Sequence, residues 1–468
     1  MRFLADLVYL LAGLLYLPIA LYQAIVRGKN RRGWGQRFGF VPRFDPSRKR
    51  IWIHAVSLGE INATPKLVEM LRERWPNVDV VFSATTDTGF ERAVKLYGAD
   101  RVVRFPLDFS FVVNRALRRI NPAMIVLIEL EVWYNLVHSA ARRGIPITIV
   151  NGRLTQRSAA RFRRLGAFTR SMFHKLTWVG AQDEAIASRF QELGVPQDRI
   201  EITSSLKWDS ASLTDHVPGQ EALAHSLGLD RSRPVWVCGS TGPGEEEMIL
   251  EAIRRRYFRQ IVGTGTAQPT PHNETVPDPP IVVLVPRKPE RFDEIAQLIT
   301  RQGFTCIRRS TSPDGSRRAP MSTTDIVLGD TMGELRKLYA LADIVFVGRS
   351  LVPLGGSDPM EVAALGKSMI VGPHTNNFSL PVGLLRQAQA LQVVSSPEEL
   401  IEAVACRLAD PASARSEGAR ARDVVRENQG ATERTAAALI RIFETASHQS
   451  SPTAVFPPIE PVHRRMNG

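Results

Sequence analysis

Residues 51–60 read IWIHAVSLGE, an apolar run followed directly by serine, glycine and glutamate. The run predicts a buried β-strand with a helix beginning after it. A strand that is apolar throughout, without alternation, is typical of a parallel sheet covered on both faces. This stretch therefore predicts an α/β fold in which polar residues gather where the strands end.

The same pattern recurs along the chain in two series separated by a polar stretch at 210–233, with helices such as 64–74 and 184–193 filling the gaps. We predict strands in the first series at 51–56, 78–84, 102–105, 124–129, 146–150, 178–181 and 200–203. Strands of the second series are predicted at 235–239, 281–286, 304–307, 325–328, 344–347, 368–371 and 391–394.

Two doubly wound, Rossmann-like units are the architecture that this order indicates, and such units bind ligands at the carboxyl ends of their strands, in the cleft between them. A chain of 468 residues is also too long for one ordinary domain. The expected boundaries are an N-terminal segment at 1–32, a first domain at 33–209, a linker at 210–233 and a second domain at 234–446. The second domain carries a loop insert at 262–280, and residues 447–468 have the composition of a disordered tail.

The bulk composition limits the partners and the compartment. The formal net charge is +13, which indicates an anionic partner such as a membrane surface or a phosphorylated substrate, or else serves solubility alone. No nucleic-acid-binding motif is present, so no nucleic-acid partner is expected. The three cysteines, Cys238, Cys306 and Cys406, are far apart, which argues against disulfides and zinc and favours a reducing compartment.

The N-terminus carries an uncharged apolar stretch at 7–26 that is just long enough to span a bilayer. Basic residues follow it directly, which predicts a single anchor with the catalytic domains in the cytoplasm. A cleaved signal peptide is disfavoured because the charge lies on the wrong side. A helix that spans the membrane and one that lies on its surface both fit the pattern.

Acids and bases follow the strands of the first series. Glu60 opens a helix after the first strand, where it is a candidate general base or an ordinary first-turn residue that satisfies the helix dipole. Ionisable groups at the end of an apolar strand are costly unless solvated or paired, and a salt-bridged rim is the alternative to a catalytic cluster. The candidates at this edge are Ser57, Gly59, Glu60, Glu129, Glu131, Arg153 and Lys207.

The second series carries polar loops of the same kind, each of which is by itself better explained as an ordinary polar loop. The turn at 239–246 (GSTGPGEE) resembles a phosphate-binding turn but lacks the glycine spacing and the lysine of the common motifs. No metal-binding motif is present, which suits a nucleoside monophosphate leaving group, and no cofactor is expected. The candidates here are Ser240, Thr241, Pro286, Arg287, Met332, Gly333, Glu334, Leu335, Asp358, Pro359, Met360, Glu361 and Asn377.

Ten of these segments, taken together, resemble one family, the 3-deoxy-D-manno-octulosonic acid (Kdo) transferases of lipid A assembly. In order from residue 52 to residue 378 they are WIHAVSLGE, IELEVWYNL, GIPITIVNGRLTQRS, AQDEAIASRF, SSLKWD, GSTGPGEEE, VPRKPERF, DTMGEL, LADIVFVGRSLVPLGG and GPHTNNF. The resemblance implies a GT-B glycosyltransferase fold, a CMP-Kdo donor, a lipid A precursor as acceptor, and inversion at the anomeric carbon without a metal. It also implies contact with inner-membrane lipids and a place in lipopolysaccharide biosynthesis at the inner membrane.

Carried over position by position, the resemblance makes Glu60 the general base, Glu129 and Glu131 the acidic pair near the reacting centre, and Lys207 a stabiliser of the transition state. It makes Pro286 and Arg287, residues 332–335 and residues 358–361 the nucleotide-binding segments. The chain departs from the family pattern where Ser357 and Asp358 replace histidine and asparagine, where Gly242 replaces histidine, and where Arg349 adds a cation.

Two other functions fit the same fold. One is a GT-B enzyme that uses a UDP-sugar on a lipid acceptor, which the identity of the released nucleotide would exclude. The other is a non-catalytic, membrane-bound member of the fold, against which the presence of Glu60, Glu131, Lys207 and Arg287 argues.

Overall fold

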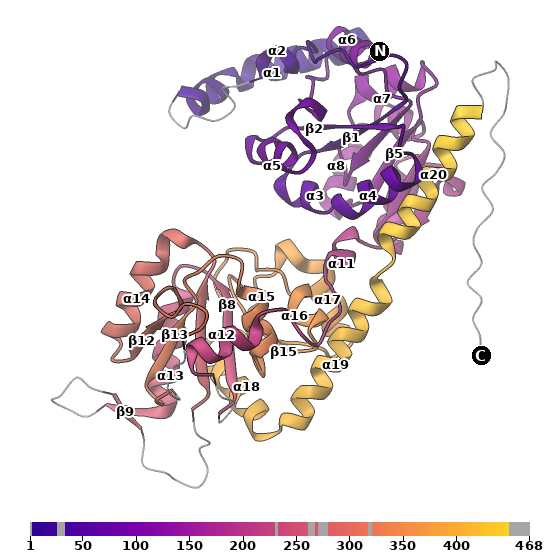
Figure 1. The fold of residues 1–468 in the computed structure, drawn as a ribbon. Coiled ribbons are helices and arrows are strands. Elements are labelled where there is room, and N and C mark those ends of the chain that lie inside the picture. Colours follow the sequence, from indigo (N-terminus) through magenta and orange to yellow (C-terminus); the bar gives the residue numbers. More distant parts are fainter. Residues whose placement is uncertain are drawn as a thin grey trace, which may run out of the picture. The chain divides into compact units, whose positions relative to one another are not determined.

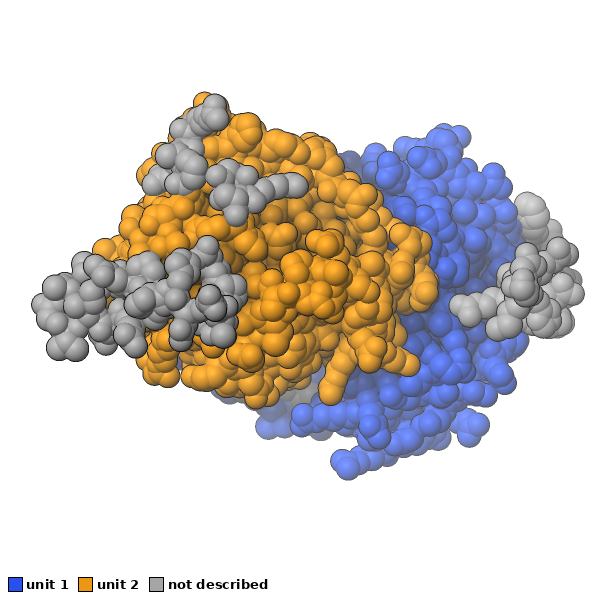
Figure 2. Space-filling model, turned by 90° about the horizontal axis from the view of Figure 1, so that it is seen from below, with its two compact units in different colours: residues 1–210, 429–468 blue, residues 211–428 orange. Residues whose placement is uncertain are grey.

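The computed structural model describes residues 2–25, 33–229, 233–260, 267–269, 279–316 and 321–448. The chain forms two compact units, one of residues 1–210 and 429–468 and the other of residues 211–428 (Figure 2). Each unit is a parallel sheet with helices packed on it (Figure 1).

The first unit contains a seven-stranded parallel sheet in the order β3-β2-β1-β4-β5-β6-β7. Its strands are β1 (Arg50–Ala55), β2 (Asp79–Ala84), β3 (Val102–Arg104), β4 (Met124–Ile128), β5 (Ile147–Gly152), β6 (Trp178–Ala181) and β7 (Ile200–Ile202). Its helices are α1 (Arg2–Ile25), α2 (Trp34–Arg37), α3 (Leu58–Asn62), α4 (Pro65–Arg74), α5 (Asp87–Tyr97), η1 (Ala99–Arg101), α6 (Ser110–Ile120), α7 (Tyr134–Ala141), α8 (Gln156–Arg164), α9 (Ala167–Phe173), α10 (Glu184–Glu192), η2 (Gln197–Arg199), α11 (Leu206–Ser210) and α20 (Ala431–His448).

The second unit repeats this plan with seven parallel strands in the order β12-β13-β11-β8-β14-β15-β16, and a small antiparallel pair, β9 and β10, lies apart from it. The strands are β8 (Val235–Thr241), β9 (Phe258–Gln260), β10 (Ala267–Pro269), β11 (Ile281–Pro286), β12 (Thr305–Arg308), β13 (Asp325–Leu328), β14 (Ile344–Val347), β15 (Ser368–Val371) and β16 (Gln392–Val393). The helices are α12 (Gln220–Leu227), α13 (Glu245–Tyr257), η3 (Pro289–Arg291), α14 (Phe292–Arg301), η4 (Arg309–Thr311), α15 (Leu335–Leu341), α16 (Met360–Ala364), η5 (Asn376–Phe378), α17 (Ser379–Gln387), α18 (Pro397–Ala409) and α19 (Pro411–Asn428).

Strand order reverses once in each sheet. In the first unit the chain runs outward from β1 through β2 and β3 and then returns to β4 on the other side of β1. In the second unit the reversal lies between β8 and β14. Ligands of doubly wound sheets bind at the carboxyl ends of the strands beside such a reversal. The fold therefore directs attention to the loops after β1 and β4, and after β8 and β14.

All fourteen predicted strands are present, and the α/β class with two parallel sheets is confirmed. The strands were recognisable because the central ones are buried along their whole length, as in β1 and β4. Most of the insert expected at 262–280 lies outside the described residues, which include β10 and residues 279–280. Of the tail expected at 447–468, only residues 447–448, at the end of α20, are described.

The expected domain boundaries differ from the structure in two places. Residues 220–227, expected within a linker, form α12, whose buried Leu223 and Leu227 belong to the second unit. Helix α20, expected in the second domain, belongs to the first unit, where its apolar face joins the core against α4. Two ion pairs, Lys66–Glu433 and Arg74–Glu444, each at 2.6 Å, flank that contact. Sequence order alone cannot reveal such a return of the chain.

Helix α1 is attached to the first unit through its first turns. Ala5 is buried in the core, and the carboxylate of Asp6 accepts hydrogen bonds from the backbone and hydroxyl of Ser110 and from the side-chain amide of Asn135. The basic residues expected to follow the anchor lie outside the described part of the chain. Within the described residues, no helix has both the length and the apolar character needed to cross a bilayer.

Candidate functional site

Glu60 lies in α3, directly after β1 at the strand-order reversal. Ser57 is the N-cap of this helix, and its hydroxyl donates to Glu60 Oε1 at 2.7 Å while accepting from the Glu60 backbone N–H. The backbone N–H of Val56 donates to Glu60 Oε2 at 2.8 Å. This reciprocal arrangement is a capping box in all but one contact, so the structural role considered from sequence is present.

Burial nevertheless makes the Glu60 carboxyl easier to protonate than an ordinary first-turn glutamate. Its side chain is 8% exposed, and burial is the largest of the effects that raise its pKa, with the neighbouring Glu129 adding to it. The hydrogen bonds from Val56 and Ser57 act in the opposite direction.

Glu129 and Glu131 lie in the loop after β4, beside Glu60. Burial, followed by the charges of Glu60 and Glu129, raises the pKa of Glu131 to about 7. Trp133 Nε1 donates to Glu131 Oε2 at 3.1 Å. Lys207, from α11, holds its ammonium nitrogen 3.9 Å from Glu129 Oε1. The structure thus brings together four predicted residues from three separate stretches of sequence.

His54, at the end of β1, faces the same cluster and was not selected from the sequence. Its ring is fully buried, stacks on Phe105 at 3.7 Å and is hydrogen-bonded through Nδ1 to Ser83. Its Nε2 lies 3.9 Å from Glu131 Oε2. A single histidine in an apolar strand resembles a core residue, so the sequence carried no signal for this contact.

The remaining predicted residues of the first unit occupy the same edge. Gly59 is exposed in α3, and a β-carbon placed on it would meet nothing closer than 3.9 Å. Arg153 is half-buried in the loop after β5. The neighbouring Asn151 accepts a hydrogen bond from the backbone N–H of Leu206, which ties that loop to the helix bearing Lys207.

Unusual backbone conformations also occur at the carboxyl edges of both sheets. Seven non-glycine residues among those described have positive φ, and five of them lie at or just after the carboxyl end of a parallel strand. Such conformations are strained for most side chains and concentrate at functional sites. The five are Glu129, Asn151 and Ser204 in the first unit, and Ser240 and Arg349 in the second.

The predicted residues of the second unit also gather at the carboxyl edge of its sheet. Ser240 and Thr241 end β8, Pro286 ends β11 and Arg287 follows it exposed. Residues 332–335 follow β13, residues 358–361 open α16, and Asn377 follows β15. The two sequence departures at the start of α16 make local contacts, because Ser357 donates to the Ser240 carbonyl at 3.2 Å and Asp358 accepts from the Met360 backbone N–H at 2.9 Å.

Two buried glutamates at the start of α13 hold these loops. Glu245 is fully buried, and its carboxylate accepts backbone N–H groups from Gly242, Arg349, Ser350 and Leu351. Burial raises the pKa of Glu245, while these hydrogen bonds lower it. Glu245 therefore joins the loop after β8 to the loop after β14.

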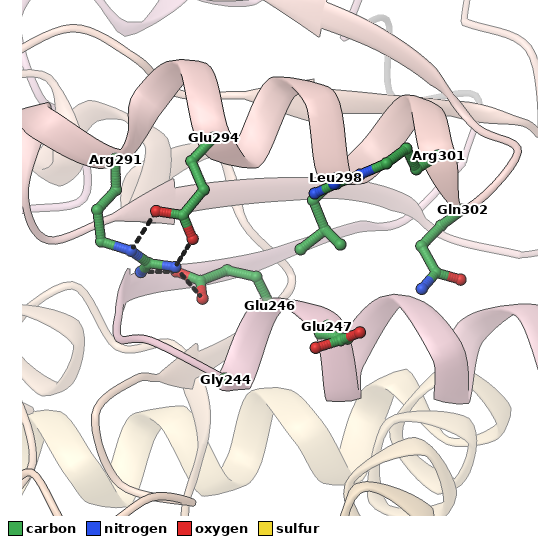
Figure 3. Close-up of a pocket in the computed structure, with 8 residues that line it drawn as sticks. All are labelled: Gly244, Glu246, Glu247, Arg291, Glu294, Leu298, Arg301 and Gln302. Carbon is green, nitrogen blue, oxygen red and sulfur yellow. Dashed lines mark hydrogen bonds and ion pairs between the residues drawn. The ribbon is translucent and has the colours of Figure 1, made fainter.

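Glu246, equally buried, pairs with Arg291 at 2.8 and 3.1 Å and accepts the Thr241 hydroxyl at 2.7 Å. Arg291 and Glu246 line a pocket of about 380 Å³ between α13 and α14, where Glu294 also contacts the Arg291 guanidinium (Figure 3). None of the predicted donor-binding residues lines this pocket, and Arg291 is already paired with two carboxylates, those of Glu246 and Glu294.

Glu334 is held by an arginine that sequence reasoning missed. Arg309 is 6% exposed and donates to both oxygens of Glu334, at 2.8 and 2.9 Å. Burial of Glu334 works against ionisation, but the hydrogen bonds from Arg309 and Thr331 hold its pKa below the ordinary value. The side chain of Glu334 therefore fixes the loop, while the neighbouring Met332 is 67% exposed.

Comparison with known proteins bears on the family. A family model described as 3-Deoxy-D-manno-octulosonic-acid transferase (kdotransferase) matches residues 32–210. A 3-deoxy-D-manno-octulosonic acid transferase of Haemophilus influenzae is 34% identical over 410 residues, which cover 87% of this chain and 90% of the relative. The chain belongs to the 3-deoxy-D-manno-octulosonic acid transferase family.

A second Kdo transferase, from Bordetella pertussis, is 34% identical over 88% of this chain and 94% of its own length. The predicted family is confirmed, and with it the enzyme class, a glycosyltransferase that transfers Kdo.

Among solved structures, a UDP-GlcNAc 2-epimerase of Neisseria meningitidis bound to UDP-GlcNAc is 12% identical with a TM-score of 0.52, covering 84% of this chain and all of that one. A glycosyltransferase of Rickettsia africae gives 10% identity and a TM-score of 0.52 over 86% of this chain and all of that one. At these identities the likeness concerns the fold alone, which is of the two-unit GT-B type in both comparisons.

Proposed function

We propose that this Kdo transferase moves Kdo from CMP-Kdo to a lipid A precursor in lipopolysaccharide biosynthesis, with inversion and without a metal, and that Glu60 is the general base. The observation that carries the proposal is the cluster of Glu60, Glu129, Glu131 and Lys207 at the strand-order reversal of the first unit. Carboxyls with raised pKa values at such an edge are suited to proton transfer.

In the proposed reaction the oxygen of an acceptor hydroxyl bonds to the anomeric carbon of Kdo while Glu60 takes its proton. The bond between that carbon and the phosphate oxygen breaks, and its electron pair leaves with CMP. Glu131, whose pKa of about 7 leaves much of it protonated at neutral pH, would limit the negative charge beside Glu60. Lys207 would offset the charge that develops as the bond breaks.

Donor binding is assigned to the carboxyl edge of the second unit. The segments proposed to hold the nucleotide are Pro286–Arg287, residues 332–335 and residues 358–361. Arg287 supplies an exposed cation after β11, which is the immediate neighbour of β13, the strand that precedes the Met332 loop. The Asp358 carboxylate already accepts a backbone N–H from Met360, which supports a role in shaping the start of α16 for ribose or base recognition.

The charge of the first unit suits an anionic acceptor. Between Glu131 and Asp183 the sequence contains no acidic residue but has nine cations: Arg142, Arg143, Arg153, Arg157, Arg161, Arg163, Arg164, Arg170 and Lys175. Most of the cations of α8 are exposed, and the exposed Leu165 follows directly. Basic side chains beside an exposed leucine fit a lipid that carries negative charge.

Helix α1 is proposed to hold the enzyme on the cytoplasmic face of the inner membrane. Its exposed side chains include Leu7, Leu11, Leu14 and Leu15, of which Leu15 is 81% exposed. The opposite side of its first turns is fixed by Asp6 to α6 and α7. An apolar helix face on a rigid base fits attachment to the membrane surface.

Incubation of the full chain with CMP-Kdo and a tetraacylated lipid A precursor tests the proposal. We expect a product heavier by one or more Kdo units, together with released CMP, and no product with UDP-sugars. Glu60→Gln should form product about 10²–10⁴-fold more slowly while still binding CMP. Transfer from a UDP-sugar, or full activity of Glu60→Gln, would refute the donor or the base, respectively.

A further inference from the structure

We propose that Arg349 binds the phosphate of the nucleotide donor. This inference rests on the proposed function, because it takes the ligand to be a cytidine monophosphate ester. Arg349 follows β14, and Thr241 ends β8, so the two flank the strand-order reversal of the second sheet. That is the place where doubly wound sheets bind nucleotides.

Several backbone N–H groups at this position are already occupied. In many such folds, backbone N–H groups of the loop at the helix start hold the phosphate. Here Glu245 takes the N–H of Gly242 from that loop and those of Arg349, Ser350 and Leu351 from the loop after β14. Moreover, α13 begins with Glu245, Glu246 and Glu247, so its first turn is acidic. A phosphate bound beside this loop therefore needs its positive partner from a side chain.

Arg349 supplies that side chain in a fixed position. Its backbone N–H donates to Glu245, its carbonyl accepts from Gly356 at 2.8 Å, and its Nη2 donates to the Leu354 carbonyl at 3.1 Å. The loop between residues 349 and 356 is thus closed through both the backbone and the guanidinium of Arg349. An arginine held in this way is oriented before a ligand arrives, which lowers the entropy lost on binding.

The guanidinium retains unused binding capacity. Its Nε is buried and has no hydrogen-bond partner. Within the described part of the chain, no carboxylate lies at ion-pair distance from it, although other buried or half-buried arginines of this unit, such as Arg291 and Arg309, each have two. The Arg349 guanidinium, which has no carboxylate partner among the described residues beside the strand-order reversal, is therefore able to bind an anionic group such as a phosphate.

The backbone of Arg349 has a conformation that favours glycine, with φ of 60°. A side chain is kept here in spite of that strain. The space beside it is also reserved, because a β-carbon on Gly242 would lie 3.1 Å from Arg349 Cγ and 2.6 Å from Leu354 Cδ1. The absence of a side chain at Gly242 therefore leaves room for the aliphatic part of the Arg349 side chain.

Titration of the full chain with CMP and with cytidine tests this role. Arg349→Gln removes the charge, and Arg349→Gly removes both the charge and the backbone strain, so relief of that strain cannot explain a loss that both share; cytidine, which lacks the phosphate, controls for a change in the loop. A hydrogen bond between charged groups contributes about 1.5–3 kcal/mol. We therefore expect both variants to bind CMP about 10- to 100-fold more weakly and cytidine unchanged. Arg415→Gln, an exposed arginine of α19, is the control for net charge.

Three outcomes would overturn the role. Equal losses for CMP and cytidine would make Arg349 a structural clamp of the 349–356 loop. Unchanged CMP binding with weaker CMP-Kdo binding would assign it to the sugar carboxylate and not to the phosphate. Failure of the unmodified chain to bind CMP would instead refute the donor assignment itself, and the role of Arg349 with it.

Discussion

His54 Nε2 lies 3.9 Å from Glu131 Oε2, yet the two residues do not form an ion pair. The imidazole is fully buried, and that burial lowers the pKa of His54 to about 3. At neutral pH the ring is therefore uncharged and cannot compensate a carboxylate. Lys207, the nearby cation, lies against Glu129. Burial therefore raises the pKa of Glu131, to about 7, without a charged histidine to offset it.

Replacing Glu131 by glutamine should make the fold less sensitive to alkaline pH. The pKa of Glu131 rises from 4.5 to about 7 on folding, so its contribution to stability is present below pH 4.5 and lost as pH rises through 7. The loss amounts to at most about 1.4 kcal/mol per pH unit. Glutamine cannot ionise, so Glu131→Gln should gain in melting temperature relative to the unmodified chain between pH 4.5 and 8. Parallel curves would contradict this, and Glu184→Gln, an exposed residue of α10, is the control.

Two substitutions at Glu60 separate its capping role from its proposed catalytic role. Glu60→Gln keeps side-chain atoms that can bond Val56 and Ser57, so we expect little change in melting temperature but a kcat lower by about 10²–10⁴. Glu60→Ala removes the cap as well and should cost about 1 kcal/mol of stability. Thermal denaturation and transfer assays measure the two effects. Equal activity of both variants and the unmodified chain would leave Glu60 as a cap only; Glu69→Ala, exposed on α4, is the control.

Much of the fold was predictable because buried parallel strands are apolar along their length. β4 (MIVLI) and β11 (IVVLVP) are recognisable without any tertiary information. Contacts between distant segments were not predictable. Helix α20 packs on the first unit through small and apolar residues such as Ala436 and Leu439. Residues of this kind occur in most amphipathic helices, so they do not indicate which unit the helix joins.

For the site, sequence motifs located the loops but not the groups that hold them. Glu245 and Glu247 both lie in the acidic first turn of α13, yet one is fully buried and the other is exposed. The departures at Gly242 and Arg349, 107 positions apart in the chain, are neighbours in the structure. Only the register between β8 and β14 brings them together.

Glu245→Ala should be severely destabilising, whereas Glu247→Ala should not. Removal of the Glu245 carboxylate leaves four backbone N–H groups without their acceptor, and each buried unpaired group costs about 1–3 kcal/mol. We expect a loss of about 3 kcal/mol or more and a raised donor KM, because both loops at the reversal point are released. Glu247→Ala should stay within about 0.5 kcal/mol. Similar denaturation midpoints for the two variants would show that Glu245 does not hold these loops.

Arg309→Met should weaken both the fold and the binding of the donor. It leaves the Glu334 carboxylate without its bidentate partner, and breaking a buried pair costs about 3–5 kcal/mol. Because the pKa of Glu334 is lowered by folding, the stability from this pair is present at neutral pH and is lost as pH falls through that lowered value. The difference between the variant and the unmodified chain should therefore shrink in acid. Arg301→Met, at the exposed end of α14, should show neither effect.

Serine substitutions on the exposed face of α1 test the proposed membrane attachment. Leu11, Leu14 and Leu15 are 53%, 56% and 81% exposed, so Leu11→Ser, Leu14→Ser and Leu15→Ser combined should leave the melting temperature of the first unit unchanged. Burying each leucine in a bilayer surface contributes about 1.5 kcal/mol or more, so the triple variant should partition onto anionic vesicles at least about 1000-fold less. Co-sedimentation measures this, with Ile202→Ser as the control because Ile202 is 48% exposed in β7 of the same unit, while Leu165→Ser tests the basic surface around α8. If the triple variant sediments like the unmodified chain while Leu165→Ser does not, the basic surface around α8, and not α1, holds the enzyme on the membrane.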